Sequence, residues 1–122
     1  MKKVIVTGGN GFIGSNLINF LIQKNYFVIN IDKSTYSKNS YILKNLSKRN
    51  YIFYKLDINN KKKILNILKK NKPNAIFNLA AETHVDRSID SPKEFINSNI
   101  CGVFNLLEAI REYKRKIRLI HI

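Results

Sequence analysis

A doubly wound, Rossmann-type α/β domain with a parallel sheet of about five strands is the fold that this 122-residue sequence predicts. Short β-branched runs alternate with amphipathic segments from end to end, glycines close the first run, and the length allows a single domain. This alternation is typical of βαβ units. Right-handed crossovers between the strands then predict the strand order 3-2-1-4-5.

Five short runs between turn signals are the expected strands. They cover residues 3–7, 26–31, 51–56, 75–79 and 117–122. The first is a β-branched run closed by glycines, which is typical of a buried strand. The last is apolar enough to be internal and ends without a turn or a polar tail. We therefore expect the chain to be truncated after its fifth strand.

Helices are expected over residues 11–24, 60–71 and 91–115, with a short one near 41–46. Ser91 is a good N-cap, and Pro92 suits the first turn of the helix that follows. Apolar residues at helical spacing are expected to face the sheet. They are Ile13, Leu17, Phe20 and Leu21 in the first helix, Ile64, Ile67 and Leu68 in the second, and Ile96, Ile100, Val103, Leu107 and Ile110 in the long one.

Composition excludes several classes of protein. A hydrophobic fraction of 44% is too high for a disordered chain, and no apolar run is long enough for a membrane span or a signal peptide. The single cysteine, Cys101, excludes an internal disulfide and a cysteine-built metal site. The net charge is +14, but the lysines are spread along the chain, which favours a solvated surface over a nucleic-acid site. We expect a cytoplasmic protein.

The loop after the first strand carries three spaced glycines, Gly8, Gly11 and Gly14. Gly8 would permit a tight turn, Gly11 would let a pyrophosphate approach the backbone N–H groups, and Gly14 would let helix and strand pack closely. The alternative is a merely convenient glycine turn. Placed between a β-branched strand and an amphipathic helix, the pattern predicts a dinucleotide site.

Acidic residues close the next two strands. Asp32, 24 residues after Gly8, is placed to accept hydrogen bonds from an adenosine ribose and to repel a 2′-phosphate, which favours NAD over NADP. Lys33 weakens that preference. Asp57 and Ile58 could frame the adenine, although Asp57 could instead cap the following helix.

The segment after the fourth strand, residues 78–88, carries two adjacent alanines, which polar residues follow. Ala80 and Ala81 would let the backbone lie flat against a dinucleotide. Glu82, His84 and Asp86 could suggest a metal site, but these ligands are acidic and too few, so we expect no metal.

Three stretches carry a family resemblance. Residues 7–16, TGGNGFIGSN, resemble the extended short-chain dehydrogenase/reductase group. Residues 30–36, NIDKSTY, and 80–89, AAETHVDRSI, are similar to those of the dTDP-glucose 4,6-dehydratases within that group. The long helix matches as well, through FINSNI at 95–100 and LLEA at 106–109. Asn10, Ser37, Lys38 and Ser98 depart from the residues that are usual in the family.

The resemblance implies NAD as the cofactor and a set of residues that bind it. These are Gly8, Gly11, Phe12, Ile13 and Gly14 at the pyrophosphate, Asp32, Lys33, Ser34 and Thr35 at the ribose, Asp57 and Ile58 at the adenine, and Leu79, Ala80, Ala81, Glu82, Thr83 and Ser98 along the cofactor. Thr83 would also touch the nucleotide sugar. Residues 1–122 would be an incomplete NAD-binding domain, and the full-length family would dimerise through helix 92–115.

The reaction that the resemblance implies converts dTDP-glucose to its 4-keto-6-deoxy product by an internal redox cycle. The family's catalytic residues follow a fifth strand like 117–122, as a Ser-Thr-Asp-Glu stretch and then a Tyr-x-x-x-Lys pair. None of them lies in this chain, so we expect no catalytic residue and no activity from it alone. The alternatives are another NAD-dependent nucleotide-sugar epimerase or dehydratase, and a non-catalytic dinucleotide-binding remnant.

Overall fold

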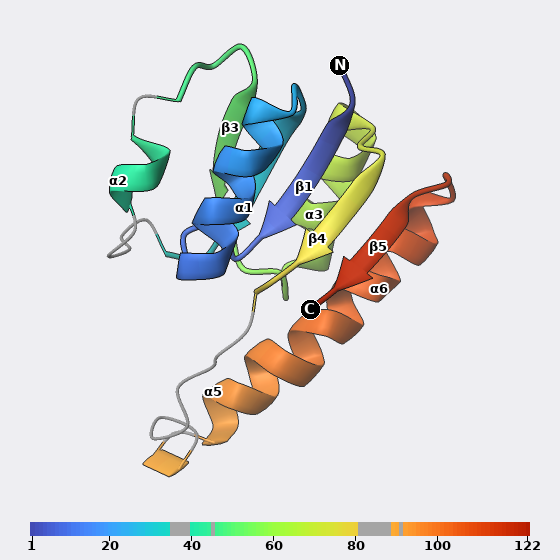
Figure 1. The fold of residues 1–122 in the computed structure, drawn as a ribbon. Coiled ribbons are helices and arrows are strands. Elements are labelled where there is room, and N and C mark those ends of the chain that lie inside the picture. Colours follow the sequence, from blue (N-terminus) through green and yellow to red (C-terminus); the bar gives the residue numbers. More distant parts are fainter. Residues whose placement is uncertain (35–39, 45, 81–88, 91) are drawn as a thin grey trace.

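The computed structural model describes residues 1–34, 40–44, 46–80, 89–90 and 92–122. In this part of the chain, one sheet holds five strands: β1 Lys3–Thr7, β2 Phe27–Asp32, β3 Tyr51–Lys55, β4 Ala75–Asn78 and β5 Arg118–His121. All four pairings are parallel, in the order β3-β2-β1-β4-β5 (Figure 1). The predicted fold class and strand order are confirmed, and no strand end differs from its predicted position by more than one residue.

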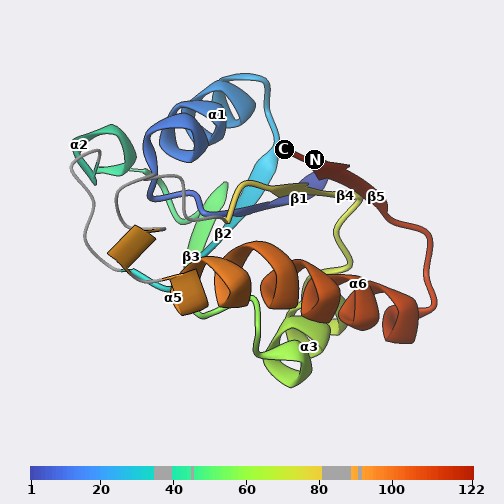
Figure 2. The same ribbon diagram turned by 90° about the horizontal axis from the view of Figure 1, so that it is seen from below.

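Helices cover both faces of the sheet (Figure 2). Helix α1 Phe12–Gln23 and the short α2 Ser40–Leu43 lie on one face. The other face carries α3 Lys61–Asn71 and a helical run made of α5 Pro92–Ile96, the π-helical turn η1 Asn97–Cys101 and α6 Gly102–Tyr113. The expected long helix is therefore present, but a π turn interrupts it. No helix in the described part combines the length and the apolar character needed to cross a membrane.

The sheet separates two apolar layers because side chains alternate between the faces of a strand. Val4, Val6 and Val28 pack against Ile18 and Leu21 of α1. On the opposite face, the strands' isoleucines pack with α3 and α6; the buried residues of this layer are Ile5, Ile29, Ile31, Ile58, Ile64, Ile67, Leu68, Ile76, Leu106, Ala109 and Tyr113. The inward positions predicted for α3 are confirmed.

The faces predicted for the other two helices are wrong in part. Helix α1 buries Gly14, Ser15, Ile18 and Leu21, while Ile13 and Phe20 are more than half exposed. The small residues let the helix approach the loop after β1 closely. Because they are not large apolar residues, the apolar periodicity does not predict that they are buried.

Helix α6 likewise turns a different face to the core than its apolar stripe predicts. Its buried positions are Gly102, Leu106, Ala109 and Tyr113, at spacings of four, three and four. Of the predicted stripe, Val103 and Ile110 are half-buried, and Ile96, Ile100 and Leu107 are exposed. Gly102 lets Ile58 of the loop after β3 pack closely on the helix, and Ala109 is buried in the same apolar layer, so the larger residues remain outside.

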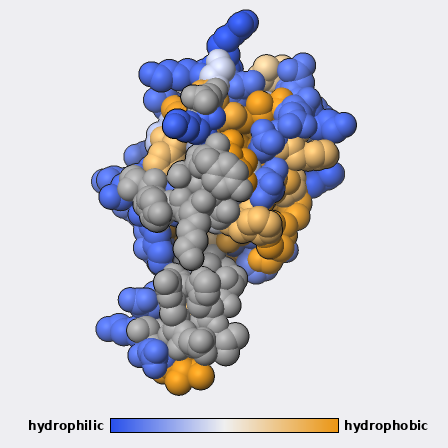
Figure 3. Space-filling view, turned by 60° about the vertical axis from the view of Figure 1, so that its left-hand side comes forward, coloured by the Kyte–Doolittle hydropathy of each residue, from blue (hydrophilic) through white to orange (hydrophobic). Residues whose placement is uncertain are grey.

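The surface of one side of the molecule is mixed in character. On the face drawn in Figure 3, the coloured residues of the upper part are hydrophilic around the edge, with hydrophobic patches between them. With 22 Lys and Arg against 8 Asp and Glu, this surface is strongly cationic.

Adjacent leucines test the orientation of α6. Leu106 is 1% exposed and Leu107 is 48% exposed. Leu106→Ala is expected to lower the free energy of unfolding by about 2–5 kcal/mol, because it leaves a cavity in the core. Leu107→Ala serves as the control and is expected to change it by about 0.5 kcal/mol or less. Urea denaturation measures both, and a larger loss for Leu107→Ala would contradict this orientation.

Candidate functional site

The carboxyl ends of four strands meet at one edge of the sheet. Thr7 of β1 is in register with Ile31 of β2 and with Asn78 of β4, and Asn78 is in register with His121 of β5. The strand order reverses between β1 and β4, and open α/β sheets bind ligands in the crevice at such a switch point. The glycine loop leaves β1 at this place (Figure 1).

Gly8 makes the turn at the end of β1 possible. Its φ of +72° lies in the left-handed region, and a Cβ there would stand 2.7 Å from the carbonyl carbon of Leu79. Its N–H donates to the Ile31 carbonyl oxygen at 2.8 Å, which ties the turn to β2. The loop is thus held between β2 and the end of β4, as the predicted tight turn requires.

Gly14 and Gly11 differ in what surrounds them. A Cβ on Gly14 would overlap the Gly8 carbonyl oxygen and lie 2.8 Å from the Gly9 Cα, so α1 starts directly on the loop backbone. Among the described residues, the one atom that a Cβ on Gly11 would meet within 4 Å is the Gly8 carbonyl oxygen, at 3.4 Å. The helix meets the loop at Gly14 and leaves the side at Gly11 accessible.

The start of α1 is open to an anion. No side chain among the described residues caps it, and its first turn carries no acidic residue. The N–H groups of a first helical turn lack partners within the helix, and the helix dipole favours negative charge there. Phe12 and Ile13 beside it are 68% and 62% exposed, which is unusual for large apolar side chains next to a glycine loop.

Asp32 is held from two sides, by the glycine loop and by the backbone that follows β2. Its Oδ2 accepts the backbone N–H of Asn10 at 3.0 Å, and its Oδ1 accepts the N–H of Ser34 at 2.9 Å. A carboxylate has about four acceptor positions, so each oxygen keeps one for a ligand hydroxyl. The carboxylate is therefore oriented and still able to accept.

Two buried asparagines at this edge were missed by the sequence analysis as site residues. Asn10 donates from Nδ2 to the Ser34 carbonyl oxygen and accepts at Oδ1 from Asn30 Nδ2 at 2.9 Å. Asn30 also donates to the Tyr51 hydroxyl at 3.0 Å. Burial raises the pKa of that hydroxyl, the bond from Asn30 opposes the rise, and the Asp32 charge adds to it. Tyr51 is therefore neutral at physiological pH.

A second network joins β1, β4 and β5. Thr7 Oγ1 accepts the backbone N–H groups of Leu79 and Ala80, each at 3.2 Å, so its own hydrogen points to Asn78 Oδ1. The Asn78 amide group is thereby oriented, and its Nδ2 lies 3.1 Å from His121 Nδ1. Nδ2 is a donor, so Nδ1 must accept and the imidazole proton sits on Nε2. This network fixes where the backbone of β4 ends.

Some of the remaining predicted cofactor residues lie in the described part of the chain, and others lie outside it. Asp57 and Ile58 follow β3, and Ser98 lies in η1, where its Oγ accepts from Lys33 Nζ at 3.3 Å. Leu79 and Ala80 lie beside Gly8. Four of the predicted cofactor residues, Thr35, Ala81, Glu82 and Thr83, lie outside the described residues, as do His84 and Asp86.

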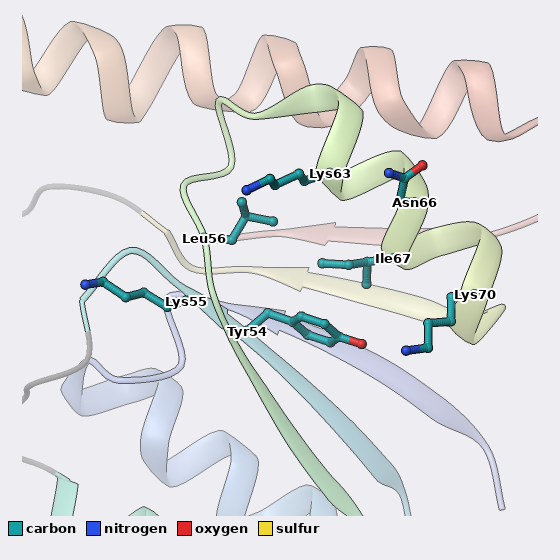
Figure 4. Close-up of a pocket in the computed structure, with 7 residues that line it drawn as sticks. All are labelled: Tyr54, Lys55, Leu56, Lys63, Asn66, Ile67 and Lys70. Carbon is teal, nitrogen blue, oxygen red and sulfur yellow. The ribbon is translucent and has the colours of Figure 1, made fainter.

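The glycine-loop edge is separate from a cavity of about 310 Å³ between β3 and α3. Figure 4 shows its lining, which consists of Tyr54, Lys55, Leu56, Lys63, Asn66, Ile67 and Lys70. None of the predicted cofactor residues is among them. The Nζ of Lys55 points away from the cavity in this view.

Comparison with known sequences shows the family of the chain. A family model described as GDP-mannose 4,6 dehydratase matches residues 5–122. The dTDP-glucose 4,6-dehydratase of Haemophilus influenzae is 46% identical over 115 residues, covering 93% of this chain and 34% of that protein. The chain thus spans about a third of the length of the curated relatives it matches. The resemblance to dTDP-glucose 4,6-dehydratases is confirmed.

Solved structures show the same fold. The dTDP-glucose 4,6-dehydratase of Bacillus anthracis in complex with NAD is 33% identical, with a TM-score of 0.82, and the match covers 99% of this chain and 37% of that one. The UDP-glucose 4-epimerase of Thermotoga maritima with UDP-glucose is 34% identical, with a TM-score of 0.83, covering 98% and 37%.

Proposed function

The chain belongs to the family described as GDP-mannose 4,6 dehydratase, and on that premise we propose that it is the NAD-binding part of a dTDP-glucose 4,6-dehydratase. The relatives named for that activity support the choice of reaction. The structure of the Bacillus anthracis relative with NAD supports the choice of cofactor. Residues 1–122 form the cofactor domain, and the activity belongs to the whole protein.

One observation carries the cofactor proposal: an oriented carboxylate and an uncapped helix start flank the same open glycine. Asp32 keeps acceptor positions for ribose hydroxyls, and the space beside Gly11 admits a pyrophosphate to the backbone N–H groups at the start of α1. Exposed Phe12 and Ile13 would be covered by the bound dinucleotide. The described residues therefore fit NAD.

Each segment has its own part in holding the cofactor. The glycine loop receives the pyrophosphate, residues 32–35 the adenosine ribose and residues 57–58 the adenine. Residues 79–83 and Ser98 line the rest of the dinucleotide, and Thr83 also touches the sugar nucleotide. When bound, NAD supplies the hydride acceptor and donor of the proposed reaction. No metal takes part in this proposal.

The substrate is a nucleotide sugar, dTDP-glucose, and the product its 4-keto-6-deoxy form. The chain's own residues bind and orient the cofactor for this reaction. The catalytic Thr and the acid pair implied by the family resemblance have no counterpart among these 122 residues. The Tyr-x-x-x-Lys spacing from Tyr51 to Lys55 lies in strand β3 and not on a helix, so it does not match the family's pair. We place the reaction in the cytoplasm, since the one cysteine is free and suits a reducing compartment.

The outer face of the long helical run supports a homodimer. Four apolar side chains follow one another along it at spacings of four, four and three residues, and all are exposed: Ile96, Ile100, Phe104 and Leu107. We refer to them as the outer ridge. Several large apolar side chains exposed along one helical run are typical of an interface between subunits. We propose that the whole protein dimerises through it.

Cofactor choice is the first test. The chain is expected to bind NAD about tenfold more tightly than NADP, because the Asp32 charge repels a 2′-phosphate. Asp32→Asn keeps an acceptor oxygen but removes the charge, so it should abolish most of that preference. Asp90→Ala removes an equal charge elsewhere and should leave the preference unchanged. Calorimetric titration measures all three, and equal binding of NAD and NADP by the native chain would contradict the role of Asp32.

Turnover is the second test. The 122-residue chain is expected to form no 4-keto-6-deoxy sugar from dTDP-glucose, even with saturating NAD, because it lacks the groups that handle the C4 hydroxyl and the elimination. Chromatography of the nucleotide sugars detects the product. The Haemophilus influenzae relative is the positive control. Product formed by the pure chain would show that its own residues suffice.

Association is the third test. Light scattering after size exclusion is expected to give a mass above 14.2 kDa, increasing with salt because salt screens the +14 charge. Phe104→Lys on the outer ridge should shift the protein toward the monomer. The matched control, Phe20→Lys, alters a phenylalanine of α1 that is also more than half exposed, and it should leave the association unchanged. A monomer at low and high salt would refute the role of the ridge.

A further inference from the structure

The π turn η1 decides how the start of the long helical run is oriented. The N–H of Gly102 donates to the carbonyl oxygen of Asn97, five residues back instead of four. One extra residue in a turn rotates the preceding segment by about 100° relative to a continuous α-helix. The buried residues of α6 hold it against α3, so its orientation is fixed. The extra residue therefore rotates residues 92–98 relative to α6. Such turns are rare and occur often at functional sites.

Two asparagine side chains, one from a loop and one from α6, donate hydrogen bonds to backbone carbonyl groups of this turn. Asn59, in the loop after β3, donates from Nδ2 to the Asn97 carbonyl oxygen at 3.1 Å. Asn105 donates from Nδ2 to Asn59 Oδ1 and to the Cys101 carbonyl oxygen, both at 2.9 Å. The carbonyl groups at both ends of η1 thus receive a side-chain amide. We call this pair the Asn59–Asn105 bridge.

The loop is held close to the helix at the same place. A Cβ on Gly102 would lie 2.8 Å from Ile58 Cδ1, so only glycine lets Ile58 pack there without a shift. The Asn59 backbone N–H donates to Asp57 Oδ1 at 2.9 Å, and Asn59 Nδ2 lies 3.2 Å from the same oxygen. Position and orientation of the Asn59 amide are therefore both determined.

The bridge connects two parts of the proposed cofactor site. Asp57 and Ile58, proposed at the adenine, precede Asn59 directly. Ser98, inside η1, accepts from Lys33 Nζ at the end of β2. Return of η1 to an α-helical register would rotate Ser98 away from Lys33. The widened turn thus places Ser98 beside Lys33, next to the end of β2.

We propose that Asn59 is a positioning residue: through the Asn59–Asn105 bridge it holds η1 in its wide register and so keeps Ser98 at the cofactor. The effect on affinity rests on the proposed NAD site, whereas the effect on the turn does not. Asn59 and Asn105 belong to no motif that the sequence analysis singled out.

Amide hydrogen exchange of the chain without NAD tests the turn. Asn59→Ala is expected to speed exchange at Gly102 about fivefold, because the partner carbonyl loses its second donor. Asn105→Ala should act in the same direction. The matched control is Asn60→Ala, one residue along, which removes the N-cap bond from the Lys63 N–H to Asn60 Oδ1 at 3.2 Å and should leave Gly102 unchanged. Unchanged exchange in both Asn59→Ala and Asn105→Ala would overturn the proposal.

NAD affinity tests the consequence. Asn59→Ala is expected to weaken binding about fivefold, and Asn60→Ala to leave it unchanged. In a Ser98→Ala background, Asn59→Ala should add little, because both changes act through one contact. Additive losses would overturn the positioning role. If the native chain binds no NAD, the proposed cofactor fails, and the exchange experiment still decides whether Asn59 holds the turn.

Discussion

The junction between β1 and α1 rests on a steric constraint at Gly8 and Gly14. Any side chain on Gly14 would overlap the Gly8 carbonyl oxygen, and any side chain on Gly8 would collide with the backbone after β4. Because both positions lack a Cβ, the helix begins on the loop and the loop touches β4. That contact sets where α1 starts, at the carboxyl edge of the sheet. It also places the Asn10 N–H within hydrogen-bond distance of Asp32.

At this edge of the sheet, amide side chains form the hydrogen bonds between loops and strands that charged residues form in many sites. Asn10 and Asn30 tie the glycine loop to β2, and Asn78 joins β1 to β5. Asn59 and Asn105 bridge the turn inside the long helix. An amide offers a donor and an acceptor without the cost of burying a charge. Neutral amides therefore order these loops without adding to the chain's net charge of +14.

The periodicity of apolar residues predicted the strands and helices better than it predicted which face of each helix is buried. The alternation of strands and helices and the order 3-2-1-4-5 were predictable because βαβ crossovers have one hand. The inward faces of α1 and α6 were predicted wrongly, since small residues such as Gly14, Gly102 and Ala109 decide how close a helix lies, and hydropathy gives them little weight. The π turn left no pattern in the sequence, because its register depends on Asn59, a residue 38 positions before Asn97.

By itself, the sequence determined the strands, the glycine junction and Asp32, because these depend on short-range requirements: β-branched runs, a missing Cβ and a strand end. Only the tertiary structure decided which asparagines act, which side of α6 is buried and where Ser98 lies. Asparagine occurs throughout this chain, so its presence alone indicates no role. Its role depends on which carbonyl oxygen or amide the fold brings within about 3 Å, and the packing of distant segments sets that distance.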